Sequence, residues 1–207
     1  GLVSHRRLSN GDDKPYELNI SWWSAMEDSS RDSNRFQFER FILTQLLVMA
    51  LKGVPAFYLP ALLASENDIK RFSMTGQRRD LNREKFKSDN LLSVFNNPES
   101  NANKILKYLR SAMDVRSELK QFHPRSKMEC LSKGRSDIVV IKRSCGPESV
   151  FAIHNMTDNK INYQLNDNDL PELNGNNLNM RDSLTSTEYS WKNISLDPFQ
   201  VIWLSSL

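Results

Sequence analysis

Residues 36–59 read FQFERFILTQLLVMALKGVPAFYL, and this stretch decides the fold class. The part from Phe36 to Leu51 is apolar on nearly every face of a helix. A helix of that kind is buried on several sides, as in a layered α/β protein. We expect it to end at Lys52-Gly53, because glycine suits the position after a helix and Pro55 cannot continue one.

The residues that follow this helix predict a strand and then a loop. Val54 to Leu59 lies between turn signals and is predicted to be a short buried strand. The polar segment from Asn67 to Ser93 is predicted to be loop-like. A buried helix, a glycine, a buried strand and a polar loop succeed one another in βα-barrels. Because a whole barrel needs about 250 residues, the sequence predicts only the C-terminal part of a (β/α)8 TIM barrel, within a longer protein.

The composition changes after His123-Pro124. Four strand-like runs separated by polar turns are found at residues 137–142, 150–154, 161–165 and 199–204. Short strands at this spacing predict a small antiparallel β-sandwich. We therefore expect an α/β chain with two domains: residues 1–124 as the C-terminal part of the catalytic barrel, and residues 125–207 as a C-terminal β-sandwich.

Two further segments give local predictions. Residues 9–15 are rich in turn formers, and Tyr16 to Met26 is predicted to be extended, with Trp22 and Trp23 packed in a core. Asp32 or Ser33 is a candidate cap for the first long helix. Ser100 is a candidate cap for a second helix, whose apolar stripe is Ile105, Leu106, Leu109, Ala112, Met113 and Leu119.

The composition excludes several classes of protein. The 207 residues are 39% hydrophobic and 26% charged, with a mean hydropathy of −0.57 and a net charge of +3. The longest apolar run, Phe41 to Leu51, is well short of the roughly 20 residues that span a bilayer. We therefore expect no membrane and no nucleic-acid partner, and a cytoplasmic location. Two cysteines without CxxC spacing and three scattered histidines predict no metal site.

Two stretches carry candidate chemistry. Thr75 to Arg83 contains three arginines whose guanidinium groups could hold sugar hydroxyls or phosphate. The alternative is an exposed arginine cluster that forms salt bridges with Asp80 and Glu84. Lys14 to Trp23 places aromatic rings beside carboxylate and amide groups, a combination that suits carbohydrate.

Four motifs occur here in the order in which they occur in one enzyme family: Tyr16 to Met26, Lys52 to Leu59, Asn67-Asp68, and Gly76 to Arg83. Over essentially its whole length the chain resembles the sucrose phosphorylase group of the α-amylase superfamily (glycoside hydrolase family 13). It is most similar to the glucosylglycerate phosphorylase-like members of that group.

The resemblance implies a retaining (β/α)8 enzyme that transfers glucose from an α-glucoside to inorganic phosphate, the co-substrate, with no cofactor. In that family an aspartate attacks the anomeric carbon, a glutamic acid protonates the leaving oxygen, and a second aspartate supports the transition state. Phosphate then releases glucose 1-phosphate. The resemblance places all three carboxylates upstream of Gly1, so we expect no catalytic residue within these 207 residues and no turnover by the isolated chain.

The resemblance also implies substrate-binding residues. Arg79 corresponds to the family arginine that hydrogen-bonds the glucosyl residue. Lys14, Tyr16 and Glu17 correspond to a mobile loop that lines the acceptor subsite, with Tyr16 as its aromatic residue. Glu17 stands where sucrose-cleaving relatives tend to carry glutamine, which favours another aglycone such as glycerate. By charge, Arg6 and Arg7 are candidates for holding a carboxylate.

Three alternatives remain open at this stage. One is a sucrose phosphorylase, and the second is an α-glucoside hydrolase of the same superfamily. The third is a non-catalytic carbohydrate-binding protein. The sequence makes no prediction of the oligomeric state.

Overall fold

The computed structural model describes residues 1–28, 35–132, 134–170 and 179–206, and they form a mixed α/β chain with antiparallel sheets. The chain divides into two compact units. We call residues 1–41 and 56–107 the hairpin unit, and residues 42–55 and 108–207 the sheet unit. The boundary predicted at residue 124 stays a prediction. No helix in the described ranges is both long and apolar enough to cross a membrane.

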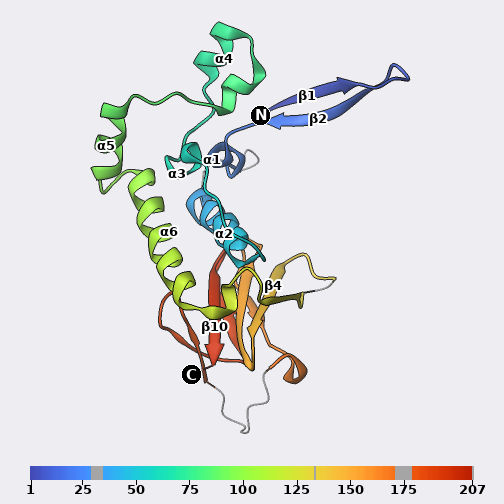
Figure 1. Cartoon of the computed structure of the whole chain (residues 1–207), viewed down its shortest axis with the longest axis vertical. Coiled ribbons are helices and arrows are strands. Elements are labelled where there is room, and N and C mark those ends of the chain that lie inside the picture. Colours follow the sequence, from blue (N-terminus) through green and yellow to red (C-terminus); the bar gives the residue numbers. More distant parts are fainter. Residues whose placement is uncertain (29–34, 133, 171–178, 207) are drawn as a thin grey trace. The chain divides into compact units, whose positions relative to one another are not determined.

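The hairpin unit contains one two-stranded antiparallel ribbon and several short helices (Figure 1). Its elements are β1 (Leu2–Arg7), β2 (Asp13–Asn19), α1 (Trp22–Ala25), α3 (Leu59–Leu62), α4 (Ile69–Thr75), η1 (Arg78–Asn82) and α5 (Ser88–Asn96). Helix α2 (Gln37–Ala50) begins in this unit and continues into the sheet unit, and α6 (Asn101–Glu118) does the same.

The sheet unit is built on a six-stranded antiparallel sheet with the strand order β3-β4-β5-β10-β7-β8, and β6 pairs with β9 in a second sheet. Its elements are η2 (Lys120–Phe122), β3 (Lys127–Cys130), β4 (Ile138–Cys145), β5 (Glu148–Asn155), β6 (Ile161–Tyr163), η3 (Asp167–Asp169), β7 (Asn179–Asp182), β8 (Glu188–Ser190), β9 (Ile194–Leu196) and β10 (Val201–Ser206). The four strands predicted from the sequence are thereby confirmed as β4, β5, β6 and β10.

Strand β5 is buried on both faces, because the large sheet is the middle of three layers. Phe151 and Ile153 face a core shared with the second sheet, where Ile194 and Leu196 of β9 contribute. The alternate residues of β5 and β10 lie on the other face, where the Trp203 ring packs 4.7 Å from the Phe122 ring. Strands packed on both faces read as continuous apolar runs, which is why β5 and β10 were visible in the sequence.

Helix α2 ends as predicted, and two arginines of the sheet unit bind its C-terminal carbonyl groups. Arg143 donates to the carbonyls of Ala50 and Leu51, both at 3.0 Å. Arg116 donates to the carbonyl of Met49 at 3.0 Å. These last carbonyls have no partner within a helix, so the guanidinium groups satisfy them and complement the negative end of the helix dipole. Gly53 then takes a positive φ of 132°, which suits glycine.

The strand predicted at Val54 to Leu59 was wrong. This segment is irregular until α3 begins at Leu59, and Val54 is 81% exposed. A barrel strand is stabilised by neighbours that hydrogen-bond to both its edges. None of the strands in the described residues pairs with this segment. The barrel part of the predicted fold is therefore not seen in the residues that the structure describes.

Other local predictions met different outcomes. The segment from Asn67 to Ser93 was predicted to be loop-like but contains α4, η1 and α5. Its charged composition misled the prediction, because α4 buries none of its residues.

The predicted cap at Ser100 is confirmed, since its hydroxyl accepts a hydrogen bond from the Asn103 amide at 3.1 Å. The candidate caps Asp32 and Ser33 lie outside the described residues.

Candidate functional site

Helix α4 and η1 form one small folded element that presents the arginines of the 75–83 motif. The Asp68 side chain caps α4 by accepting from the Arg71 amide at 2.8 Å, and Gly76 ends the helix at a φ of 66°. The chain then turns back, and the Asp68 amide donates to the carbonyl of Leu81 at 2.8 Å. These contacts set the position of η1, on which Arg78 and Arg79 stand.

Asp80 stabilises this element, as the sequence analysis allowed. Its carboxylate lies 3.2 Å from the Arg71 guanidinium. A hydrogen bond from Thr75 lowers the pKa of Asp80, and Arg71 lowers it further. The predicted arginine–Asp80 salt bridge is thus present, but its arginine is Arg71 of α4. Glu84, the other predicted partner, has no ion pair among the described contacts.

The β1–β2 ribbon holds the other candidate residues. Gly11 turns the chain at a φ of 90°, and the strands pair with Ser4 opposite Glu17 and His5 opposite Pro15. The register shift between these pairs leaves Tyr16 as the extra residue of a β-bulge. Tyr16 is 62% exposed, so its ring is available to a ligand. The extended region predicted at Tyr16 is confirmed as far as Asn19, but β1 was not predicted.

Two consecutive arginines of η1 bind the two strands of this ribbon. Arg78 donates from Nη1 to the carbonyl of Val3 on β1. Arg79 donates from Nε to Glu17 Oε2 on β2, at 3.2 Å. We call this pair of contacts the arginine clamp. It brings Arg79 and Glu17 together, although they lie 62 positions apart in the sequence.

The clamp leaves Arg79 able to bind a ligand as well. The Arg79 side chain is 53% exposed, and only its Nε takes part in the ion pair. The terminal nitrogens keep four N–H groups in a planar fork, which suits paired hydroxyls of a sugar or the oxygens of an anion. Glu17 orients that fork from one side.

Lys14 lies further along β2 and is not part of the clamp. It is exposed and stands opposite Arg6 in the register. Directly opposite residues of like charge repel each other across a sheet. An anion at this end of the ribbon would remove that repulsion, which fits the earlier suggestion that Arg6 holds a carboxylate.

The two tryptophans that follow the ribbon differ in burial. Trp23 is 5% exposed, and its ring packs edge-on against Phe41 with 5.5 Å between centroids. Trp22 is 43% exposed, so the prediction that both rings pack in a core was wrong for Trp22. The Ser21 hydroxyl starts a helical turn by accepting from the Ser24 amide, which places the adjacent rings on different sides.

The sequence analysis did not predict that Arg78 contacts the ribbon or that Asn67 joins two segments of the hairpin unit. The Asn67 side chain accepts from the Ser21 amide at 2.8 Å, and its own amide donates to the Ser24 hydroxyl at 3.1 Å. These bonds join the segment before α4 to the end of the ribbon. Asn67 lies within a quoted family motif, and that was the available signal.

No group of three or more histidine, cysteine, aspartate or glutamate side chains that could hold a metal is present in the described ranges. Cys130 and Cys145 are free and exposed.

Comparison with known proteins gives glucosylglycerate phosphorylases and a sucrose phosphorylase as relatives. No protein-family model matches the chain. It is 24% identical over 203 residues to the glucosylglycerate phosphorylase of Escherichia coli (strain K12), covering 98% of this chain and 34% of that protein. It is 30% identical over 144 residues to the glucosylglycerate phosphorylase of Spirochaeta thermophila, covering 70% of this chain and 24% of that protein. It is 22% identical to the sucrose phosphorylase of Streptococcus mutans over 74% of this chain and 29% of that protein.

Solved structures agree at the level of the fold. The α-amylase of Geobacillus thermoleovorans in complex with acarbose superimposes with a TM-score of 0.59 at 18% identity, covering 82% of this chain and 33% of that one. The trehalose-6-phosphate hydrolase of Bacillus licheniformis also gives 0.59, at 14% identity, over 84% of this chain and 40% of that one. The resemblance to the sucrose phosphorylase group, and to its glucosylglycerate phosphorylases in particular, is confirmed. The chain spans between 24% and 34% of the length of these curated relatives.

Proposed function

We propose that this relative of the glucosylglycerate phosphorylases is the C-terminal part of a retaining glucoside phosphorylase, with glucosylglycerate as its preferred glucosyl donor. The reaction would transfer glucose from the α-glucoside to inorganic phosphate and release glucose 1-phosphate and glycerate. Three of the relatives are named as glucosylglycerate phosphorylases, which supports this substrate over sucrose.

The observation that carries the proposal is the contact between Arg79 and Glu17. Arg79 was assigned to the glucosyl residue and Glu17 to the acceptor loop, on separate motifs of the family. The structure joins them by an ion pair of 3.2 Å between Nε and Oε2. Two residues with roles on either side of one glycosidic bond must lie close together, and these two do.

In this proposal Arg79 is the chain's contribution to glucosyl binding. Its terminal N–H groups would donate to sugar hydroxyls, and Glu17 would hold the guanidinium in the required plane. Hydrogen bonds from a charged donor are stronger than those between neutral groups, so they can contribute several kcal/mol to transition-state binding.

The ribbon would then form the acceptor side. Tyr16 offers an exposed ring at the bulge, and Lys14 with Arg6 offers positive charge opposite one another. A glycerate carboxylate is an anion, whereas fructose is neutral. This difference in charge favours glucosylglycerate and makes sucrose the second candidate.

The catalytic aspartates and the acid glutamate are proposed to lie in residues upstream of Gly1. The isolated chain would therefore bind sugar weakly and turn over nothing. The cytoplasm is the proposed location, and inorganic phosphate is the only co-substrate proposed.

The first experiment is the intact mass of the protein in its native source. A mass well above the 24.0 kDa of this chain, with phosphate-dependent release of glucose 1-phosphate from glucosylglycerate, would support the proposal. Release from sucrose alone would indicate a sucrose phosphorylase. Glucose formed without phosphate would indicate a hydrolase. A mass near 24.0 kDa without activity would favour a carbohydrate-binding role.

A further inference from the structure

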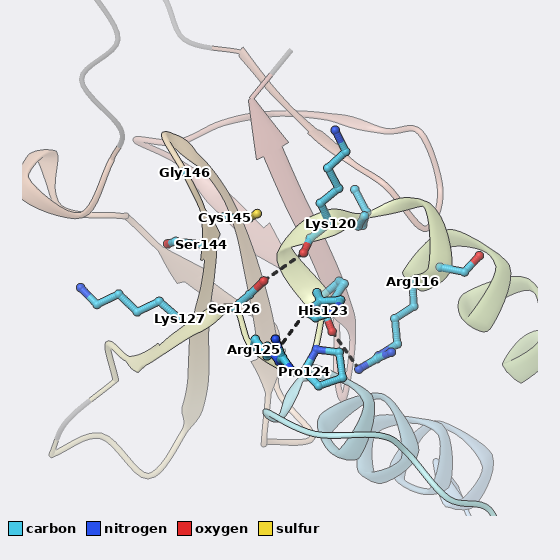
Figure 2. A pocket seen from close by; sticks show the side chains of 13 residues that line it. Arg116, Lys120, His123, Pro124, Arg125, Ser126, Lys127, Ser144, Cys145 and Gly146 are labelled. Atoms are coloured by element: carbon cyan, nitrogen blue, oxygen red, sulfur yellow. Dashed lines mark hydrogen bonds between the residues drawn. The ribbon is translucent and has the colours of Figure 1, made fainter.

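The sheet unit contains a groove of about 730 Å³ that no part of the proposed reaction uses. It is lined by the end of α6, by η2 and the loop after it, by the first residue of β3, and by the turn from β4 to β5 (Figure 2). Grooves of this volume accept whole metabolites, since small-molecule sites are typically about 300–1,000 Å³. All of its lining residues belong to one unit.

Cationic side chains line the groove, and most of them have no carboxylate partner among the described contacts. Arg116, Lys120, Arg125 and Lys127 line it together with His123, and none of its lining residues is aspartate or glutamate. Lys127 is balanced, since its amino group lies 2.8 Å from Glu129 and points away from the others (Figure 2). Within the described part of the chain, neither Lys120 nor Arg125 forms a salt bridge.

Two arginines bind the backbone of the segment that lines the groove. Arg143 is fully buried and, besides the carbonyls of α2, binds the carbonyl of His123 at 2.8 Å. Arg116 binds the carbonyl of Phe122 at 3.1 Å. Burial lowers the pKa of both guanidinium groups, and the charge of Arg116 lowers the pKa of Arg143 further. The described partners of these two cations are carbonyl groups and the Phe122 ring, none of which carries a net charge, so a positive potential is left at this place.

The loop that carries these donors is held in one conformation. Besides the bonds from Arg116 and Arg143, the Ser126 hydroxyl donates to the carbonyl of Lys120 at 3.0 Å. The Arg125 amide donates to Nδ1 of His123 at 3.2 Å. That bond makes Nδ1 an acceptor, so in the neutral ring the proton lies on Nε2, which is then a donor. A groove whose loop is already fixed loses little entropy when a ligand binds.

We propose that this groove binds a phosphorylated small molecule, in which a phosphate meets Arg125 and His123 and an attached ring covers Leu119 and Pro124. The Lys120 side chain points away from these two residues (Figure 2) and contributes its positive charge. Cations and a histidine N–H suit the phosphate oxygens. A free phosphate ion would fill only a small part of the volume, so the ligand carries a body as well. Sugar phosphates and nucleotides share this chemistry. The site is separate from the arginine clamp and does not depend on the proposed function.

The test is isothermal titration calorimetry of the 207-residue chain with glucose 1-phosphate and, separately, with ATP. Inorganic phosphate, glucose and adenosine are the matched partial ligands. We expect at least one phosphate ester to bind with a Kd of about 1 mM or tighter, and to bind at least about tenfold more tightly than inorganic phosphate or the neutral compounds. Which ester binds identifies the source of the ligand.

Two double variants assign the binding to the groove. Lys120→Gln with Arg125→Gln should weaken the ester's binding by about tenfold or more. Lys107→Gln with Arg110→Gln removes the same charge from exposed positions of α6 outside the groove and should change the Kd by less than about twofold. Equal losses in both variants would mean general attraction to a basic chain and would overturn the proposal. Two other results would also overturn it. One is the absence of ester binding at 10 mM (about −2.7 kcal/mol), and the other is binding of inorganic phosphate as tight as that of the esters.

Discussion

The hairpin unit exposes more of its large apolar side chains than the sheet unit does. In the sheet unit, large residues such as Phe151, Ile153 and Trp203 are completely buried between three layers. In the hairpin unit, Leu18, Ile69 and Met74 are 58%, 69% and 76% exposed. Exposed apolar side chains in such number are typical of a surface that another part of a protein covers. The contrast indicates that the sheet unit carries its own core, whereas the hairpin unit depends more on polar contacts such as the arginine clamp.

The largest expected difference between the two units is in the free energy of unfolding that is lost when one tryptophan is removed from each. Trp203→Ala should lower the free energy of unfolding by about 3–5 kcal/mol, because it leaves a cavity beside Phe122. Trp22→Ala, the matched change at a side chain that is 43% exposed, should cost about 1 kcal/mol or less. Urea denaturation followed by far-ultraviolet circular dichroism measures both. Similar costs would show that the two units do not differ as described.

The pH dependence of the free energy of unfolding tests the burial of His154 in the sheet unit. Burial lowers the pKa of His154 to about 4, against about 6.5 in an unfolded chain. The unfolded state therefore binds the proton first, so this residue reduces stability as the pH falls from about 6.5 to about 4, by on the order of 3 kcal/mol in full. Urea unfolding of wild type and His154→Gln across that range measures the effect.

The His154→Gln variant should lose this part of the acid dependence. Exposed His5→Gln, in the hairpin unit, is its control and should keep the wild-type slope. Asp182 acts in the other direction, since burial raises its pKa and protonation then favours the folded state. The difference between the two variants isolates His154, and parallel curves would contradict its burial as the neutral ring.

In the hairpin unit the largest effect should be on catalysis. In the full-length enzyme, Arg79→Ala should lower kcat/KM for the glucosyl donor by on the order of 10²-fold or more, or at least ~2.7 kcal/mol of transition-state binding. Arg83→Ala, an exposed arginine in the same motif, should change it by less than about threefold. Steady-state kinetics with phosphate measure both, and unchanged kinetics for Arg79→Ala would remove this residue from the site.

The smallest expected effect is at Glu17. Glu17→Gln keeps a hydrogen-bond acceptor but loses the ion pair with Arg79, which is worth up to about 1 kcal/mol at a partly exposed position. Amide hydrogen exchange of β1 and β2 in the 207-residue chain should become faster, while Glu188→Gln on β8 should leave it unchanged. In the full-length enzyme the variant should alter acceptor preference more than glucosyl transfer, and equal losses with every aglycone would contradict this role.

The sequence predicted four of the eight strands described in the sheet unit, because their signals are local. Continuous apolar runs marked β5 and β10, and Gly53 marked the end of α2. Strands β3, β7, β8 and β9 were missed, since they are three or four residues long and mostly polar or mixed. Arg143 was also missed, because a buried arginine at the end of an apolar strand looks like an exposed one until its carbonyl partners are known.

For the candidate site, the sequence identified residues but not the contacts between them. Family motifs identified Arg79, Tyr16, Glu17 and Lys14, but assigned them to separate segments. Their roles as ligand-binding residues stay predictions. Nothing in the spacing of the motifs indicated that Arg78 binds β1 or that Arg79 binds Glu17, because those contacts join residues more than 60 positions apart.

By itself, the sequence determined the α/β class, the antiparallel module and the family resemblance, since hydrophobic period, turn residues and motif order are all properties of short segments. Only the tertiary structure decided the rest. Val54 to Leu59 lacks strand partners among the described residues, and the arginine clamp joins η1 to the ribbon. Arg116 and Arg143 bind the backbone of the segment that lines the groove of the sheet unit. Each of these features depends on residues that are distant in the sequence but close in space, because strand pairing, ion pairs and pockets are formed by such neighbours.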